Sequence, residues 1–368
     1  MNASNENTSG GKHLLDIPPS EARDAVDAWI ARAGATKFRA DQVCEHVFRR
    51  KILAPSRMSN IPESLREQLA ASLLSPVFRS MQLSCSKDGT RKYGFALADG
   101  ALIESVWIPT EARGTLCVSS QAGCPAGCTF CATGAGGFRR NLRPSEIIGQ
   151  WLAVRDDLLA NQLGEVTQIV FMGMGEPLLN FPHLLAALRY MTASQFFAFS
   201  PRRITVSTVG VAPRIAPLLA EFPQVRLALS LHSAIDITRS QIVPMNRKYS
   251  VADLRKTLQE IRDSTRRITL EYVLLNDVND SKAEAIALAQ FATDAANHIN
   301  LLPFHPFPGA SYPPTGATRL RAFRRAIESA GYRGDVTLRK SRGLDIQGAC
   351  GQLALHQLGD QQLLPADK

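Results

Sequence analysis

Three cysteines lie close together in one glycine- and proline-containing stretch of the chain. Cys124, Cys128 and Cys131 have the spacing C-x3-C-x2-C within GCPAGCTFCATG, residues 123–134. Soft thiolates of this kind bind zinc, copper(I) or iron–sulfur clusters. A structural zinc site needs four ligands, and no fourth Cys or His follows at zinc-finger spacing. An iron–sulfur cluster held by three cysteines keeps one iron free for another molecule.

The cysteine count and the absence of long apolar runs indicate in which cellular compartment the protein works. The chain has seven cysteines, an odd number without the spacing of a disulfide framework. In a reducing compartment, clustered cysteines are typical of metal binding or catalysis. No apolar run approaches the roughly 20 residues of a membrane helix, and the polar N-terminus lacks the apolar core of a secretory signal. The sequence therefore predicts a cytoplasmic protein without a membrane partner.

The chain is basic, with a formal net charge of +9 at pH 7. A surplus of this size favours a polyanionic partner, above all nucleic acid. The alternative is that the charges are solvated faces that keep the protein soluble. The basic clumps lie at 48–51, 138–143, 201–203, 265–267 and 319–325.

Residue patterns divide the first third of the chain into three parts. Residues 1–12 are polar without apolar periodicity, which predicts a disordered tail. Residues 13–77 place apolar residues at three- and four-residue steps, which predicts a small helical domain. Residues 78–110 alternate apolar and polar residues around Asp99-Gly100, which predicts a β-hairpin extension.

Residues 111–341 alternate between strand-like and helix-like segments, and residues 342–368 form a C-terminal tail. The strand-like segments are continuous apolar, β-branched runs, as in a buried parallel sheet. About six strand–helix units predict an α/β fold, a partial (β/α)6 TIM-like barrel with its chemistry at the C-terminal ends of the strands. The alternative architecture is an open doubly wound sheet.

Residues suited to ligand binding stand where the strand-like runs end. A glycine there lets the backbone approach a ligand, and a carboxylate can bind an ammonium group. Taken singly, a serine or histidine is more often a hydrogen-bonded core residue. Their shared place at strand ends favours a binding site. These residues are Gly175 and Glu176 in FMGMGEPLLN, Ser207 in ITVSTVG, and Ser230, Leu231 and His232 in LALSLHS.

The cysteine motif, with Phe130 before its third cysteine, resembles the signature of the radical SAM superfamily. The resemblance implies a radical SAM barrel in which Cys124, Cys128 and Cys131 hold a [4Fe-4S] cluster. The open iron then binds S-adenosylmethionine, and the reduced cluster cleaves it to a 5′-deoxyadenosyl radical. Gly175-Glu176 resembles the superfamily's GGE motif. The other strand-end residues are implied as further contacts to S-adenosylmethionine.

QAGCPAGCTFCATG and RGLDIQGACGQL (342–353), with the N-terminal KFRADQVCEHVF, resemble the RlmN/Cfr family of radical SAM RNA methyltransferases. The resemblance covers nearly the whole chain and is greatest to the RlmN branch. It implies methylation of C2 of an adenosine in large-subunit (23S) ribosomal RNA and of the adenosine 3′ to the tRNA anticodon. It also implies an RNA-binding role for the N-terminal helical domain. The alternatives are C8 methylation, as in the Cfr branch, and a non-enzymatic RNA-binding protein with a structural metal.

The same resemblance implies roles for three further residues. Adenine C2 is electron-poor, so a direct displacement on the sulfonium methyl group cannot succeed there. Cys350, flanked by small residues that suit a mobile loop, instead accepts a methyl group as a thiolate. The methyl group becomes a carbon radical, adds to C2, and Glu104 removes the C2 proton. Cys117 then releases the methylated RNA by attacking Cys350, which leaves a Cys117–Cys350 disulfide.

The resemblance to the family also implies partners. At one position this sequence departs from the family's pattern. Two molecules of S-adenosylmethionine are consumed per turnover, an electron donor such as flavodoxin or ferredoxin reduces the cluster, and a monomer is expected. His305 stands where the family usually has an Asn linked to S-adenosylmethionine binding. The candidate phosphate contacts in the helical domain are Arg39, Arg49, Arg50 and Lys51.

Overall fold

The computed structural model describes residues 12–262, 267–353 and 363–364 of the chain. The helices are α1 (Ala22–Arg32), α2 (Phe38–Cys44), α3 (Glu63–Ala70), α4 (Ala132–Ala135), α5 (Pro144–Ala160), α6 (Phe181–Thr192), α7 (Ala212–Glu221), α8 (Asp236–Ile242), α9 (Val251–Ile261), α10 (Lys282–Ala295) and α11 (Ala317–Ser329). The strands are β1 (Phe78–Cys85), β2 (Arg91–Leu97), β3 (Leu102–Thr110), β4 (Arg113–Cys117), β5 (Gln121–Gly123), β6 (Phe138–Asn141), β7 (Gln168–Phe171), β8 (Ile204–Thr208), β9 (Arg226–Ser230), β10 (Ile268–Leu274), β11 (His298–Pro303), β12 (Asp335–Leu338) and β13 (Leu363–Leu364).

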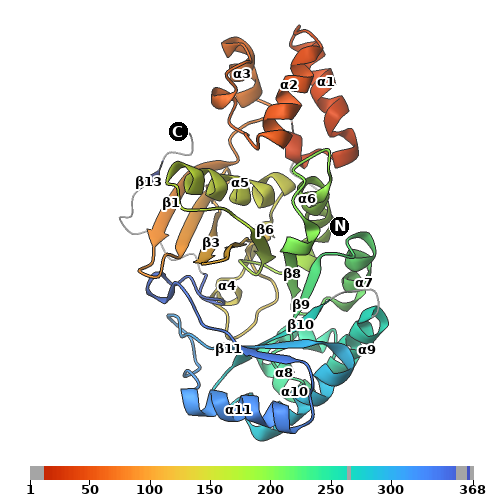
Figure 1. Cartoon of the computed structure of the whole chain (residues 1–368), viewed down its shortest axis with the longest axis vertical. Helices are drawn as coiled ribbons and strands as arrows, with labels where there is room; N and C mark the ends of the chain where they lie inside the picture. The colour runs from red at the N-terminus through yellow and green to blue at the C-terminus, as the bar shows by residue number, and fades with distance from the viewer. Residues whose placement is uncertain (1–11, 263–266, 354–362, 365–368) are drawn as a thin grey trace.

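The predicted N-terminal helices form α1, α2 and α3, which lie together at one end of the molecule (Figure 1). Helix α1 buries Val26, Trp29 and Ile30, a spacing that brings the three side chains onto the same face of a helix. Gly34 follows the helix with a φ of +66°, the left-handed conformation that commonly ends helices. The expected disordered tail lies, apart from residue 12, outside the described residues. None of the described helices is long and apolar enough to cross a membrane.

The N-terminal helices contact the rest of the protein through α6. The Tyr190 hydroxyl lies 3.1 Å from the Leu14 carbonyl oxygen and 2.8 Å from that of Ile17, and donates to them. The Phe48 ring stacks on Tyr190, with 6.1 Å between centroids, and contacts Phe197 edge to face, with 5.6 Å between centroids. Aromatic contacts of this kind bury large apolar areas. The helical region is therefore held against the strand–helix region by a shared apolar core.

The predicted hairpin is present as β2 and β3. The two strands pair antiparallel, with Glu104 opposite Gly94. The turn between them has Gly100 at a φ of +78°, and the Asp99 carboxylate accepts a hydrogen bond from the Ala101 amide at 3.0 Å. Strand β1 extends the hairpin to three antiparallel strands.

The strand–helix region forms the mostly parallel sheet that the sequence predicts. Strands β4, β7, β8, β9, β10, β11 and β12 are neighbours in that order and pair parallel. A doubly wound sheet reverses its strand order at a switch point. The order here does not reverse, so the doubly wound alternative is wrong. Since crossovers between parallel strands are right-handed, an unreversed order places the connecting helices on the same face, as in an open barrel.

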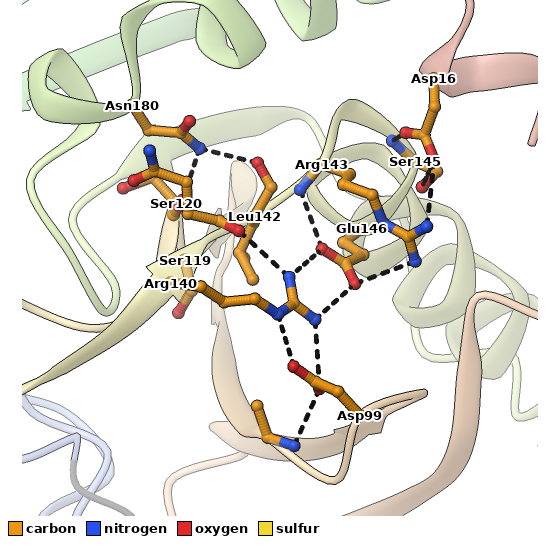
Figure 2. Close-up of polar contacts among 12 residues, drawn as sticks. Asp16, Asp99, Ser119, Ser120, Arg140, Leu142, Arg143, Ser145, Glu146 and Asn180 are labelled. Carbon is orange, nitrogen blue, oxygen red and sulfur yellow. Dashed lines mark hydrogen bonds and ion pairs between the residues drawn. The ribbon is translucent and has the colours of Figure 1, made fainter. Parts of the chain in front are cut away.

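A small second sheet of β5 and β6, which the sequence analysis did not expect, encloses the cysteine stretch. Arg140 of β6 donates to Asp99 at 2.6 Å and to Glu146, which is fully buried at the start of α5, at 2.8 Å (Figure 2). Arg143 forms a further ion pair with Glu146 at 3.3 Å. The clump at 138–143 is therefore not a free basic face, because two of its arginines are paired with carboxylates of the protein itself.

The junction in Figure 2 also ties the cysteine stretch to neighbouring elements. The Asn180 amide donates at 2.8 Å to the carbonyl oxygens of Ser120 and Leu142, which flank the small sheet. The Asp16 carboxylate accepts from both the amide and the hydroxyl of Ser145 at 2.9 Å. The β5–β6 sheet is thus fixed to the start of α5 and to the turn before α6, and α5 is fixed in turn to the N-terminal region.

Candidate active site

A cavity of about 680 Å³ runs through the interior of the open sheet. Alternate residues of the parallel strands line it, because successive side chains of a strand point to opposite faces. The sequence-predicted residues on its wall are Cys117, Cys124, Cys128, Cys131, Gly175, Glu176, Ser207, Ser230, His232 and Cys350. Glu104 and Leu231 are not part of the wall. The tertiary structure therefore brings together ten residues that are spread over more than 230 positions of the chain.

The cysteine loop is a tight turn that requires its glycines. Gly123 has a φ of +76°, and a Cβ atom there would lie 2.0 Å from the carbonyl oxygen of Gly137. That close approach allows the Cys124 amide to donate to the same oxygen at 2.8 Å. At the far end, a Cβ on Gly134 would lie 2.9 Å from the carbonyl oxygen of Cys128. No other residue fits these approaches without moving the backbone.

The three cysteines of the loop fit a cluster better than a single metal ion. All three are free thiols, and Cys128 is buried. Burial raises the pKa of Cys124 to about 12 and also raises that of Cys128 well above its usual range, so a cation must replace the proton before either is a thiolate. Within the described residues, no three His, Cys, Asp or Glu side chains converge on one ion. A [4Fe-4S] cluster needs no such convergence, because each cysteine binds a different iron.

Gly175 and Glu176 form a second wall next to the cysteine loop. Gly175 has a φ of +99°, and a Cβ there would lie 2.7 Å from the Gln121 backbone nitrogen. The buried Glu176 carboxylate accepts from the amides of Leu178 at 2.9 Å and Val209 at 2.7 Å. Burial nevertheless raises the pKa of Glu176 to about 7. The carboxylate faces the cavity without a cationic partner among the described residues, so it can receive an ammonium group.

The ends of β8 and β9 contribute hydroxyl groups and a neutral imidazole. The hydroxyl oxygens of Ser207 and Ser230 lie 3.2 Å apart. His232 has a φ of +59°, and its Nδ1 accepts from the Val273 amide at 3.0 Å. The edge of Phe130 meets the imidazole, with 4.6 Å between ring centroids. Leu231 is fully buried and is not part of the cavity wall, and its amide and carbonyl are bonded to the Glu271 carbonyl and to Arg239.

Replacing His232 with asparagine is expected to remove a pH-dependent part of the free energy of unfolding. Burial lowers the pKa of His232 to about 3, whereas the unfolded chain titrates with the ordinary pKa near 6.5. Between these values the unfolded state binds more protons, so the wild type loses stability as the pH falls below 6.5. The loss reaches about 2 kcal/mol at pH 5. Asparagine retains an acceptor for the Val273 amide and tolerates a positive φ.

Denaturant titrations of wild type and His232→Asn at pH 7.5 and pH 5.0 measure this effect. The difference in unfolding free energy between the two proteins should shift in favour of the variant at the lower pH. A difference that does not change with pH would mean that His232 titrates with the same pKa in the folded and the unfolded protein.

The two cysteines outside the loop approach the cavity from different elements. Cys117 ends β4 and is buried, and burial, followed by the neighbouring Cys350, raises its pKa to about 12. Cys350 is exposed. Arg339, just beyond β12, is a cavity residue that the sequence analysis missed. Charge on Cys350, Glu271 and Cys117 raises the pKa of Arg339, so one guanidinium faces both thiols.

The segment that carries Cys350 is bound on both sides of the thiol. The Gly351 carbonyl accepts from the Ala132 amide at 2.8 Å, directly after the cysteine loop. Before the thiol, the Gly343 amide donates to Asp88 at 2.9 Å. The sequence analysis expected a mobile loop here. The described residues show this segment anchored to the cysteine loop and to the β1–β2 turn.

Glu104 lies in β3 behind this segment. The carboxylate is buried and forms an ion pair with Lys92 Nζ at 3.0 Å, so it is not an exposed strand residue. It shares a strand face with Val106, which lines the cavity. Glu104 therefore lies beside the cavity rather than on its wall.

The sequence analysis did not identify two further cavity residues, Glu271 and Asn300. It also did not predict the hydrogen-bond partner of His305. Glu271 is buried in β10 and accepts from Asn300 at 2.8 Å. A charged residue inside the apolar run ITLEYVL was the signal that could have revealed it. His305 Nε2 lies 2.6 Å from the Ser341 hydroxyl, so it connects the end of β11 to the C-terminal tail.

The candidate phosphate contacts of the helical domain all have partners within the protein. Arg50 forms an exposed ion pair, which is worth little and is easily exchanged for a phosphate. The partners are the Asn60 carbonyl for Arg39 at 2.8 Å, the Ser194 carbonyl for Arg49 at 2.9 Å, Glu45 for Arg50 at 2.7 Å and the Trp151 ring for Lys51 at 5.8 Å from its centroid.

Two family models match different parts of the chain. Residues 14–74 match the ribosomal RNA large subunit methyltransferase N-terminal domain, and residues 118–289 match the radical SAM superfamily. The dual-specificity RNA methyltransferase RlmN of Halorhodospira halophila is 42% identical over 95% of this chain and 95% of its own length. The protein of the same name from Alkalilimnicola ehrlichii is 41% identical over 93% of both chains.

A solved structure has the same fold. The crystal structure of a radical SAM methyltransferase from Sphaerobacter thermophilus superposes with a TM-score of 0.86 at 37% sequence identity. The match covers 93% of this chain and 98% of the other. Both parts of the chain, including the N-terminal helices, therefore fall within the similarity.

Proposed function

The chain belongs to the RlmN family of dual-specificity radical SAM RNA methyltransferases, and we propose that the cavity through its open sheet is the site of that reaction. The protein methylates C2 of adenine in 23S ribosomal RNA and in transfer RNA; in transfer RNA the proposed target is the adenosine 3′ to the anticodon. One observation carries the site assignment. Cys117 and Cys350, far apart in the sequence, share one cavity with the three-cysteine loop.

The residues present fit a [4Fe-4S] cluster and S-adenosylmethionine. When bound, these groups supply a methyl cation equivalent and, after one-electron reduction, a radical that removes a hydrogen atom. Cys124, Cys128 and Cys131 would hold the cluster. The Glu176 carboxylate would bind the ammonium group of the methionine part, and Gly175 lets the chain pass close to Gln121 at this point.

The ends of β8 and β9 would hold the remaining polar groups of S-adenosylmethionine. Ser207 and Ser230 offer adjacent hydroxyls. The Leu231 amide and carbonyl are bonded to Glu271 and Arg239, so Leu231 would act by positioning its neighbours. His232 is neutral with Nδ1 already occupied, so its Nε2–H is a donor toward the cavity.

Cys350 is proposed as the residue that accepts the methyl group. This residue is exposed and lines the cavity, and Arg339 lines the same cavity. The methyl carbon on Cys350 then loses a hydrogen atom and bonds to adenine C2. Each turnover consumes two molecules of S-adenosylmethionine, one for each of these events. A flavodoxin or a ferredoxin is the proposed source of electrons.

Glu104 and Cys117 are proposed to complete the reaction. Glu104 takes the proton from C2, and its ion pair with Lys92 at 3.0 Å places a cation beside this buried carboxylate. The adduct gives up its unpaired electron, which the bound cluster would take back. Cys117 then attacks the sulfur of Cys350, which breaks the bond from that sulfur to the former methyl carbon and leaves a Cys117–Cys350 disulfide for the electron donor to reduce. That carbon takes up a proton to become the methyl group of the product. The target adenosine must leave its stack to reach the cavity.

Product analysis tests this function. The protein is loaded anaerobically with iron and sulfide and incubated with S-adenosylmethionine, a reductant and RNA from a strain that lacks the modification. Digestion and mass spectrometry should give 2-methyladenosine from both ribosomal and transfer RNA. 8-Methyladenosine would contradict the C2 assignment. Formation of 5′-deoxyadenosine without any methylated adenosine would contradict the substrate.

A further inference from the structure

Arg239 in α8 is a fully buried guanidinium that the reaction described above does not use. Burying an unpaired charge costs much free energy unless an anion or several hydrogen bonds compensate. Arg239 forms no ion pair with any carboxylate among the described residues. Its four contacts are to neutral oxygens: the carbonyls of Val209 at 2.6 Å, Leu231 at 2.9 Å and Ser230 at 3.4 Å, and the side-chain amide of Asn246 at 2.8 Å.

The carbonyls that Arg239 binds belong to the ends of two neighbouring strands. Val209 directly follows β8, and Ser230 and Leu231 end β9. These segments carry Ser207 and His232 on the cavity wall. The planar guanidinium donates several hydrogen bonds in fixed directions, so it holds both strand ends in one arrangement.

Helix α8 also contacts the cysteine loop. The carbonyl of Ile242, its last residue, accepts from the Thr129 amide at 3.1 Å, between the second and third cysteines. Ile242 and Val243 belong to the small apolar core that contains Cys128 and Phe130. One short helix therefore joins the cysteine loop to the strand ends.

The positive charge of Arg239 has no carboxylate in direct contact among the described residues, although Asp236 attracts it from farther away. Burial lowers the pKa of Arg239 to about 10, so it remains a cation at neutral pH. The charged groups that interact with it are Cys128, which acts on it most strongly, and Asp236, which is occupied by the Asn246 and Val251 amides. Three thiolates on an iron–sulfur cluster bring the missing negative charge to this side of the cavity, and one-electron reduction adds more.

We propose that Arg239 is a positioning residue of the radical centre, which holds the ends of β8 and β9 against the cysteine loop and places a permanent positive charge behind Cys128. This rests on the part of the proposed function in which the three cysteines hold a cluster. Two separable effects follow. The hydrogen bonds pre-organise the strand ends that bind S-adenosylmethionine. The charge stabilises the reduced, more negative cluster and so raises its reduction potential.

Two substitutions separate the effects in the cluster-loaded full chain. Arg239→Lys keeps the charge but cannot reach three carbonyls at once, whereas Arg239→Gln loses both. Anaerobic calorimetry gives the dissociation constant for S-adenosylmethionine, and a redox titration followed by electron paramagnetic resonance gives the potential. Arg189→Gln, which breaks an exposed ion pair with Glu221, is the matched control. Iron content and thermal unfolding report whether each variant folds and loads.

Both variants should bind S-adenosylmethionine at least tenfold more weakly, on the order expected for the loss of one or more charged hydrogen bonds. Only Arg239→Gln should shift the potential to more negative values. If Arg239→Lys binds S-adenosylmethionine with the wild-type dissociation constant, the positioning role is overturned. This measurement tests the positioning role even if Arg239→Gln does not take up the cluster. A loaded Arg239→Gln with the wild-type potential overturns the charge effect. Neither readout uses RNA, so failure of the substrate assignment is seen separately.

Discussion

Cys350→Ala is expected to reduce RNA methylation to below about a thousandth of the wild-type rate while the protein still cleaves S-adenosylmethionine to 5′-deoxyadenosine. Adenine C2 is too electron-poor to attack a sulfonium methyl group, so the reaction has no path once the accepting sulfur is gone. The cluster ligands and the walls formed by Glu176 and His232 remain in place. The two products are measured in the same anaerobic reaction by mass spectrometry.

Cys85→Ala is the matched control for this prediction. Cys85 is also a free and exposed cysteine, but it ends β1 and is not part of the cavity wall. The control should methylate RNA at the wild-type rate. Continued methylation by Cys350→Ala would instead mean that the methyl group reaches the RNA without passing through this thiol.

Cys117→Ala is expected to trap the protein on its RNA substrate. Without a second thiol on the opposite wall, nothing attacks the Cys350 sulfur, and the bond from that sulfur to the RNA persists. The variant should complete at most one turnover and yield a covalent protein–RNA species that survives denaturation. A denaturing gel with labelled RNA detects this species, and release of methylated RNA should fall by about a thousandfold.

The double variant Cys117→Ala, Cys350→Ala identifies the attachment site, because it should form no covalent species. Cys44→Ala controls for loss of a partly buried cysteine outside the cavity and should turn over normally. Repeated turnover by Cys117→Ala, with no trapped RNA, would assign product release to another group.

The sequence alone determined features that depend on neighbours along the chain. The spacing of Cys124, Cys128 and Cys131 requires a tight loop with three soft ligands, whatever surrounds it. The predicted hairpin and the run of buried strands were confirmed, because periodicity reports which faces a segment buries. Polar residues at strand ends, such as Ser207 and His232, were found for a related reason. Parallel strands bring their C-terminal ends together at one edge of the sheet. A residue at the end of a strand is therefore expected to lie in the site at that edge.

Only the tertiary structure decided which charged side chains face one another. Arg140 reads as part of a basic clump, yet it is paired with Asp99 and Glu146. Glu104 reads as an exposed strand residue, yet it is buried against Lys92.

The arginines of the site show why the sequence alone does not reveal which charged side chains face one another. Arg339 and Arg239 belong to no local motif, and their partners come from other strands and loops. A charge is stabilised by whatever lies around it in three dimensions, and long-range packing sets those neighbours. The residue pattern along the chain therefore locates the ligating side chains of this site. The tertiary structure decides which charged groups surround those side chains.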